Sequence, residues 1–229
     1  FNRPVSLLLS QDGKTLYASQ ATGNLIIAKV ADDGTISLDQ VVKLPLSMVH
    51  YPGTQGNPYP GGLALSDDGK TLYICLNRNN TLGVFDLSSR AIVKQIPVGN
   101  APTNVVVSGD KAYVSNRGGR PAHEGDFTVD SSGTPIVAQR ESGYAITGTV
   151  SVVDLKADVE MRTIEVGVHP TALLLDGRRL FVANTNSDTV SMAFLDGSHN
   201  LSQERVSVGL ERIIAGLEED TPRKRKARK

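Results

Sequence analysis

Several residue types are scarce in this sequence, and each shortage narrows the class of protein. The 229 residues contain no tryptophan, three methionines and one cysteine, and aromatic residues make up 5% of the chain. Cys75 has no partner for an intramolecular disulfide, and its place in the apolar run TLYICL predicts a buried, inert thiol. A disulfide-stapled fold is therefore excluded, while the redox compartment stays open.

Long apolar runs and a net charge are also lacking. No stretch approaches the roughly 18 apolar residues that span a bilayer, and no signal peptide is visible. The chain opens at Phe1 within a repeat, so we expect an upstream segment to have been left out. The formal charge is zero, but six of the 24 basic residues lie in residues 223–229, which leaves 18 basic against 24 acidic groups elsewhere. This mildly acidic body argues against nucleic-acid binding by the folded part.

Glycine and proline are plentiful, with 22 and 11 residues, and they mark a repeat. Each unit reads as a proline, an apolar run, an Asp/Gly turn, a strand ending in a small polar residue, a second turn and another alternating strand. The units are PVSLLLSQDGKTLYASQATGNLIIAKV from Pro4, PGGLALSDDGKTLYICLNRNNTLGVFDL from Pro60, PTNVVVSGDKAYVSNRGG from Pro102 and PTALLLDGRRLFVANTNSDTVSMAFL from Pro170.

The turn residues and the crossovers predict four antiparallel strands per unit. Asp12-Gly13, Asp68-Gly69 and Asp176-Gly177, with Gly109-Asp110 in reversed order, supply the positive φ angles of tight hairpins. A crossover glycine recurs at Gly99, Gly167 and Gly209. Repeats of about 40 residues with four strands are typical of propeller blades. The sequence therefore predicts an all-β propeller of four-stranded antiparallel blades.

The repeat resembles a known family. LYASQATGNL, LYICLNRNNTLGVFDL, AYVSNRGG and LFVANTNSDTVSM are similar to the motif of the YVTN propeller family over roughly residues 4–210. The long insert after SNRGGR resembles bacterial proteins that join such a propeller to a phosphoesterase domain, and that catalytic domain is not in this sequence. The resemblance implies a periplasmic or secreted protein, and it implies seven blades where this sequence has about four.

We therefore expect a truncated propeller followed by a non-repeat tail. The predicted blades cover about residues 1–46, 59–100, 101–168 and 169–210, and residues 211–229 are predicted to form a short helix and a disordered basic tail. A closed four-bladed ring is the alternative. An open arc would expose apolar faces and self-associate.

Two long insertions are predicted to lie on one face of the disc. They are residues 47–59, between two blades, and residues 117–148, between the second and third strands of a blade. Long loops often carry function, so this loop face is the candidate binding surface. The candidate ligand- or partner-binding residues around the channel mouth and in the insertion are Arg3, Tyr59, Asn77, Asn116, Arg117, Arg120, His123, His169 and Asn184.

Other interpretations of these residues stay open. The asparagines also suit Asx turns, the residues before proline suit a polar surface, and the long insertion suits an exposed, partly mobile loop. No catalytic residue, metal ligand or cofactor site is assigned, because no nucleophile motif or metal-ligand spacing is present.

The sequence thus favours a non-catalytic scaffold over an enzyme. Its expected partner is a protein, an attached catalytic domain or a small polar ligand. One alternative is a lactonase-like hydrolase at the channel mouth, with histidine or arginine polarising a carbonyl. The other is a purely structural module of a larger phosphoesterase-type protein.

Overall fold

The computed structural model describes residues 2–47, 56–131, 133–195 and 203–207. In this part of the chain the regular elements are β-strands, apart from one short 3₁₀ turn, η1 (Asn77–Asn79). Here, no helix is long and apolar enough to cross a membrane. The strands form four four-stranded sheets and one two-stranded sheet, and all strand pairs are antiparallel. The fold is an all-β propeller of four-stranded antiparallel blades, which confirms the predicted class.

Each four-stranded sheet is one blade. Blade 1 consists of β1 (Pro4–Leu9), β2 (Thr15–Gln20), β3 (Asn24–Val30) and β4 (Ile36–Lys43). Blade 2 consists of β5 (Pro60–Leu65), β6 (Thr71–Leu76), β7 (Thr81–Asp86) and β8 (Ala91–Pro97). Blade 3 consists of β9 (Asn100–Ser108), β10 (Lys111–Gly119), β13 (Gly148–Asp154) and β14 (Val159–Val166). Blade 4 consists of β15 (Pro170–Asp176), β16 (Arg179–Asn184), β17 (Thr189–Phe194) and β18 (Gln203–Ser207).

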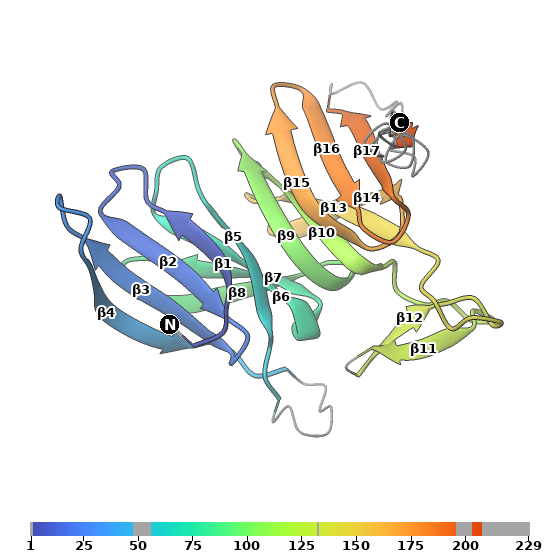
Figure 1. Cartoon of the computed structure of the whole chain (residues 1–229), viewed down its shortest axis with the longest axis horizontal. Coiled ribbons are helices and arrows are strands. Elements are labelled where there is room, and N and C mark those ends of the chain that lie inside the picture. The colour runs from blue at the N-terminus through green and yellow to red at the C-terminus, as the bar shows by residue number, and fades with distance from the viewer. Residues whose placement is uncertain (1, 48–55, 132, 196–202, 208–229) are drawn as a thin grey trace, which may run out of the picture.

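The first strand of each blade lies innermost. Strand β1 contacts β5, β5 contacts β9, and β9 contacts β15, while the last strands β8 and β14 meet on the outside. The blades follow one another around an open arc, with blade 1 and blade 4 at its two ends (Figure 1). Tight turns occupy one edge of the arc, and the insertion of blade 3 leaves from the other, which is the lower edge in Figure 1; residues 48–55 of the other insertion lie outside the described residues.

The hydrophobic core lies between neighbouring blades, because the two faces of a blade sheet are both apolar. The cluster between blades 1 and 2 contains Tyr17, Leu25, Ile27, Leu44, Leu63, Leu72, Ile74, Leu76 and Phe85. Blades 2 and 3 share Ala64, Tyr73, Cys75, Leu82, Ile96, Val98, Val105, Ala112, Val114 and Val153. Blades 3 and 4 share Tyr113, Val150, Val152, Ile164, Val166, Leu180, Val182 and Ala193. Each blade is thus stabilised by the blades beside it.

The hairpin turns between the first two strands follow the sequence closely. Gly13, Gly69, Gly109 and Gly177 have φ angles of 72°, 68°, 55° and 56°. These values confirm the positive φ predicted from the Asp/Gly pairs, since glycine adopts this conformation without a Cβ penalty.

Candidate functional site

The long insertion of blade 3 is folded. Strands β11 (Thr128–Ser131) and β12 (Thr134–Val137) pair as an antiparallel hairpin. The β-branched residues of DFTVDSSGTPIV favour strands, and Gly133 has a φ of 90° in the turn between them. The sequence predicts an irregular loop here, and the structure differs because the local strand pairing satisfies the backbone hydrogen-bonding groups.

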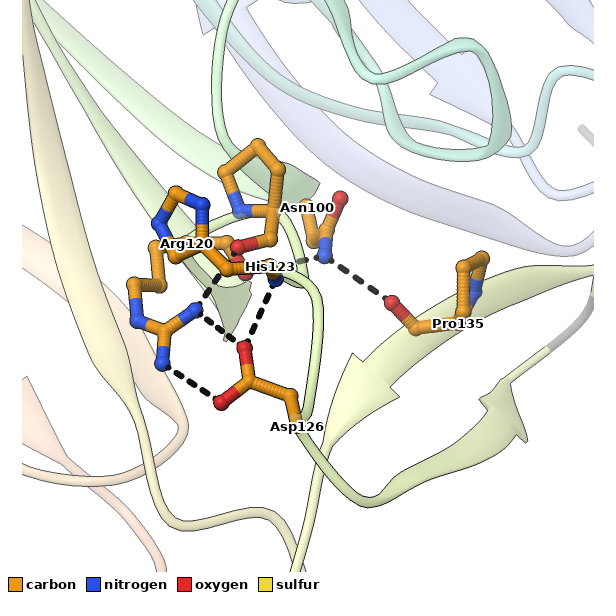
Figure 2. Close-up of polar contacts among 6 residues, drawn as sticks. Asn100, Arg120, His123, Asp126 and Pro135 are labelled. Carbon is orange, nitrogen blue, oxygen red and sulfur yellow. Dashed lines mark hydrogen bonds and ion pairs between the residues drawn. The ribbon is translucent and has the colours of Figure 1, made fainter.

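An ion pair closes the first part of the insertion. The guanidinium of Arg120 donates to both carboxylate oxygens of Asp126, at 2.6 and 3.0 Å, and the backbone N–H of His123 donates to the same carboxylate at 2.7 Å (Figure 2). The hydrogen bond from Arg120, followed by that from His123, lowers the pKa of Asp126 to about 2. Asp126 therefore stays ionised over the working pH range and holds this turn closed.

A buried asparagine ties the insertion to the inner strand of blade 3. Asn100 is 5% exposed, and its Nδ2 donates to the carbonyl of Arg120 at 3.1 Å and to that of Pro135 at 3.2 Å (Figure 2). The turn residue Asn80 of blade 2 also donates to Thr134 at 3.4 Å. Both halves of the insertion are thus fixed to the blades that flank it.

Replacement of Asp126 by asparagine is expected to loosen the insertion while leaving the blades folded. The wild-type carboxylate has a pKa of about 2, below its ordinary value of 3.8. Its stabilising contribution is therefore complete above about pH 4 and is lost as the pH falls through about 2. Limited proteolysis at pH 7 should cut residues 117–148 several-fold faster in Asp126→Asn than in the wild type. Glu124→Gln is the control, and equal cleavage of all three proteins would contradict this role of Asp126.

The four residues before the blade-starting prolines share one backbone conformation. Arg3, Tyr59, Ala101 and His169 have φ angles of 52°, 47°, 53° and 60°. Each lies where the chain enters an innermost strand, at the loop face. Arg3 is exposed and precedes β1 of blade 1, whereas His169 precedes β15 of blade 4. These side chains are spread along the arc, one to each blade.

Two of the predicted residues, His169 before β15 and Arg117 on β10, interact electrostatically. Burial lowers the pKa of His169 below its ordinary value of 6.5, and the positive charge of Arg117 lowers it further. His169 is half-buried and Arg117 is also partly accessible. A neutral imidazole beside a guanidinium can accept a proton or a hydrogen bond while the arginine attracts an anionic or carbonyl oxygen.

Asn116 and Asn184 use their Nδ2 groups for hydrogen bonds within their own blades, while their Oδ1 atoms are buried without a partner among the described residues. Asn116 is 0% exposed, and its Nδ2 donates to Thr149 at 3.0 Å and to Ser151 at 2.7 Å. Asn184 is 2% exposed and donates in the same way to Thr189 at 3.0 Å and to Ser191 at 2.9 Å. The two amides thus tie the second strand of blades 3 and 4 to the third.

Asn77 and Tyr59 belong to a different local arrangement. Leu76 pairs with Pro60 in the place that Asn116 and Asn184 take in their blades, so Asn77 lies one residue further along the chain. Its Nδ2 donates to the carbonyl of Pro102 at 3.1 Å and joins blade 2 to blade 3. The guanidinium of Arg78 lies 5.3 Å from the centre of the Tyr59 ring.

Several residues of the loop face were not singled out from the sequence. Tyr144 and Ile146 are 75% and 54% exposed on the returning half of the insertion. Their backbone is fixed, because the carbonyl of Tyr144 accepts from Gln139 at 2.9 Å and the N–H of Ile146 donates to Val137 at 3.2 Å. The only sequence signal for Tyr144 and Ile146 as candidate binding residues was that they are apolar residues within a polar insertion. Asn100 carried no signal, since its partners are 20 and 35 residues away.

The structure adds two facts about reactive groups. Among the residues it describes, no three His, Cys, Asp or Glu side chains gather to hold a metal ion. Cys75 is buried as predicted, and desolvation raises the pKa of its thiol well above the ordinary range. The thiol is therefore protonated and inert at neutral pH.

Comparison with known proteins defines the fold and leaves the family open. No family model matches the chain. Antigen Lp49 of Leptospira interrogans serogroup Icterohaemorrhagiae serovar copenhageni (strain Fiocruz L1-130) is 27% identical over 198 residues, which cover 85% of this chain. The chain spans 39% of the length of that antigen.

Solved structures are similar at lower identity. The structure of U3-55K superposes with a TM-score of 0.61 at 14% identity, over 89% of this chain and 51% of that chain. The periplasmic gluconolactonase PpgL of Pseudomonas aeruginosa gives a TM-score of 0.49 at 20% identity, over 90% of this chain and 70% of that chain. At these identities the likeness to U3-55K supports the fold alone.

Proposed function

We propose that this chain is a non-catalytic β-propeller scaffold of the YVTN-repeat type, and that its loop face binds a partner protein or an attached domain. The observation that carries the proposal is the exposure of Tyr144 and Ile146, at 75% and 54%, on an insertion that the blades hold in place. Exposed apolar side chains on a fixed backbone are the usual anchors of a protein interface.

The surroundings of these two residues support a macromolecular partner over a small polar ligand. Leu46, which lies just before the other insertion on the same face, is 65% exposed. The side chains of Asn116 and Asn184, which would orient a small ligand, are instead buried, and their Nδ2 groups donate within the blades. A surface fixed before binding loses little conformational freedom on association, which favours affinity.

The electrostatic influence of Arg117 on the half-buried His169 favours a second candidate, a lactonase-like hydrolase. The lowered pKa of His169 keeps its imidazole neutral at pH 7, so it can take up a proton there. The arginine would polarise a lactone carbonyl in such a mechanism. The resemblance of the repeat supports a periplasmic or secreted location for either function.

The binding proposal is tested with the chain immobilised as bait in an extract of its source cells. A Tyr144→Ser/Ile146→Ser double variant removes the two anchors. Val93→Ser is the matched control, because Val93 is 62% exposed on the outer strand of blade 2, away from the insertion. We expect a protein that the wild type and the control retain, and that the double variant loses. For that protein in purified form, the Kd should rise at least about tenfold, or 1.4 kcal/mol. Equal retention by all three baits would contradict the proposal.

The hydrolase candidate has its own assay. Gluconolactone hydrolysis above the buffer rate, lost in His169→Ala and in Arg117→Ala, would favour an enzyme over a scaffold. Hydrolysis at the buffer rate, together with anchor-dependent retention of a partner, is the outcome we expect.

A further inference from the structure

A hollow of about 320 Å³ lies between blades 2 and 3, on the edge of the arc that carries the tight turns. Residues of the turns β5–β6, β9–β10 and β13–β14 and of strand β6 line it. Both of its blades are inside the arc, because blade 1 packs on blade 2 and blade 4 packs on blade 3. The charged and aromatic side chains of the hollow are Asp67, Asp68, Asp110, Lys156 and Tyr73.

Tyr73 brings an unpaired hydroxyl group to this hollow. Its ring packs in the cluster shared by blades 2 and 3, and the residue is 7% exposed. Among the described residues the hydroxyl group has no hydrogen-bond partner, yet protein does not enclose its oxygen, so it opens into the hollow. Burial raises the pKa of Tyr73, and the charges of Asp158 and Asp68 raise it further. The phenol is therefore neutral at pH 7 and can donate or accept a hydrogen bond.

The charged groups that line the hollow are mostly negative. The carboxylates of Asp67, Asp68 and Asp110 line it together with the ammonium group of Lys156. That ammonium group is paired with Asp110, at 2.5 Å. The ammonium group of Lys70 lies 4.0 Å from Asp68 on a side chain that is 80% exposed, so solvent screens its charge. The carboxylates of Asp67 and Asp68 thus give the hollow an attraction for a positive ligand.

These two carboxylates are held in place by the turns themselves. Oδ1 of Asp68 accepts from the hydroxyl of Ser66 at 2.6 Å and from the N–H of Lys70 at 3.1 Å. Oδ2 of Asp67 accepts from the N–H of Gly109 at 3.2 Å, which joins a turn of blade 2 to a turn of blade 3. The hydrogen bond from Ser66 is the main cause that lowers the pKa of Asp68 below its ordinary value of 3.8. Asp68 is therefore ionised at neutral pH.

The next interface repeats the tyrosine with a different set of charges. A hollow of about 370 Å³ between blades 3 and 4 is lined by Tyr113, which is 5% exposed and has the position in blade 3 that Tyr73 has in blade 2. The charged residues that line this second hollow are Asp110, Lys111 and Arg178. Two cationic side chains against one carboxylate do not favour a positive ligand there. The second hollow is thus a matched comparison within the same molecule.

We propose that the hollow between blades 2 and 3 binds a guanidinium group, such as that of an arginine side chain in a peptide. A guanidinium carries five N–H donors in one plane and pairs with carboxylates more specifically than an ammonium group does. Asp67 and Asp68 supply the carboxylates, and the hydroxyl oxygen of Tyr73 accepts a further N–H. Among the described residues the carboxylates do not converge as metal ligands do, so the site suits an organic cation. The proposal does not depend on what the loop face binds.

The test is a titration of the ¹⁵N-labelled chain with N-acetylarginine amide at pH 7, followed by NMR. We expect saturable shifts of the amide signals of Gly109, Asp110 and Lys156, which lie around the hollow. The matched probe is N-acetylcitrulline amide, which has nearly the same shape but a neutral urea group. Its Kd should be at least about tenfold higher, because charge-assisted hydrogen bonds are stronger than neutral ones.

Four variants locate the site. Tyr73→Phe keeps the buried ring and removes only the hydroxyl, and Asp67→Asn keeps an acceptor for the N–H of Gly109 but loses the charge. Each should raise the Kd for the arginine probe at least about fivefold. Tyr113→Phe in the second hollow is the control for the hydroxyl. Asp33→Asn is the control for the charge, because Asp33 accepts from Thr35 in an exposed turn of blade 1.

The two controls should bind the arginine probe like the wild type, and circular dichroism should show that all four variants are folded. Shifts that do not saturate in the wild type would overturn the proposal. Equal affinity for the citrulline probe would overturn it as well, since the ligand would then be recognised without its charge. So would a loss in Tyr113→Phe or Asp33→Asn as large as the loss in Tyr73→Phe.

Discussion

Replacement of Phe85 by alanine is expected to lower the free energy of unfolding by about 3–5 kcal/mol, the usual cost of deleting a fully buried phenylalanine. Phe85 is 0% exposed in strand β7 and belongs to the cluster between blades 1 and 2. Loss of the ring leaves a cavity. Strand β7 cannot move to fill it without breaking the backbone pairing of residue 85 with Leu72 on β6 and Ile92 on β8. Urea unfolding followed by circular dichroism measures the change.

The control for this prediction is Val93→Ala, which shortens an apolar side chain that is 62% exposed in the neighbouring strand β8. Its expected effect is within about 0.5 kcal/mol, as for most surface substitutions. A loss below about 1 kcal/mol for Phe85→Ala would mean that the blades do not share this core.

Gly148→Ala is the second substitution with a large expected effect, because there is no room for a side chain where β13 begins. A Cβ at Gly148 would lie 1.8 Å from the carbonyl oxygen of Gly167 and 2.9 Å from Cδ of Pro170. The nearest obstacle is backbone, so the crossover into blade 4 must move. Overpacking costs of this kind are about 1–3 kcal/mol and occasionally more, and we expect about 3 kcal/mol here.

Gly177→Ala separates this steric clash from the cost of the backbone conformation. Gly177 has a φ of 56°, and a Cβ added there would meet no atom within 4 Å. Alanine at this position therefore meets only the left-handed conformational penalty of about 1–2 kcal/mol. Thermal unfolding of the two variants should show the larger loss for Gly148→Ala. The reverse order would show that the crossover is less tightly packed than the structure indicates.

The fold was largely predictable because the residues that determine each blade are close together in the chain and the same pattern recurs in every repeat. The Asp/Gly pairs that set the hairpins are adjacent in the chain, and the apolar alternation between them marks the strands. The hairpin β11–β12 was missed for the opposite reason. This hairpin occurs once, and its two four-residue strands are short. Their alternation of apolar and polar residues is too brief to stand out within a long polar insertion.

The site was less predictable because its contacts are long-range or depend on geometry. The sequence marked Asn116 and Asn184 as polar strand ends, but their burial and their partners on the third strand appear only when the blade is assembled. Residues before proline ordinarily favour extended backbone. The positive φ of Arg3, Tyr59, Ala101 and His169 departs from that rule in every blade, because the chain must turn sharply into the innermost strand.

The most direct test of this account is amide hydrogen exchange across the insertion, since the loop face depends on its being a folded part of blade 3. In the free protein at pH 7, the paired amides of Val129, Ile136 and Ala138 should exchange far more slowly than those of an unstructured peptide, and the protection should fall in Asp126→Asn. Exchange of these amides at the unprotected rate in the wild type would contradict the fixed loop face and the binding function proposed for it.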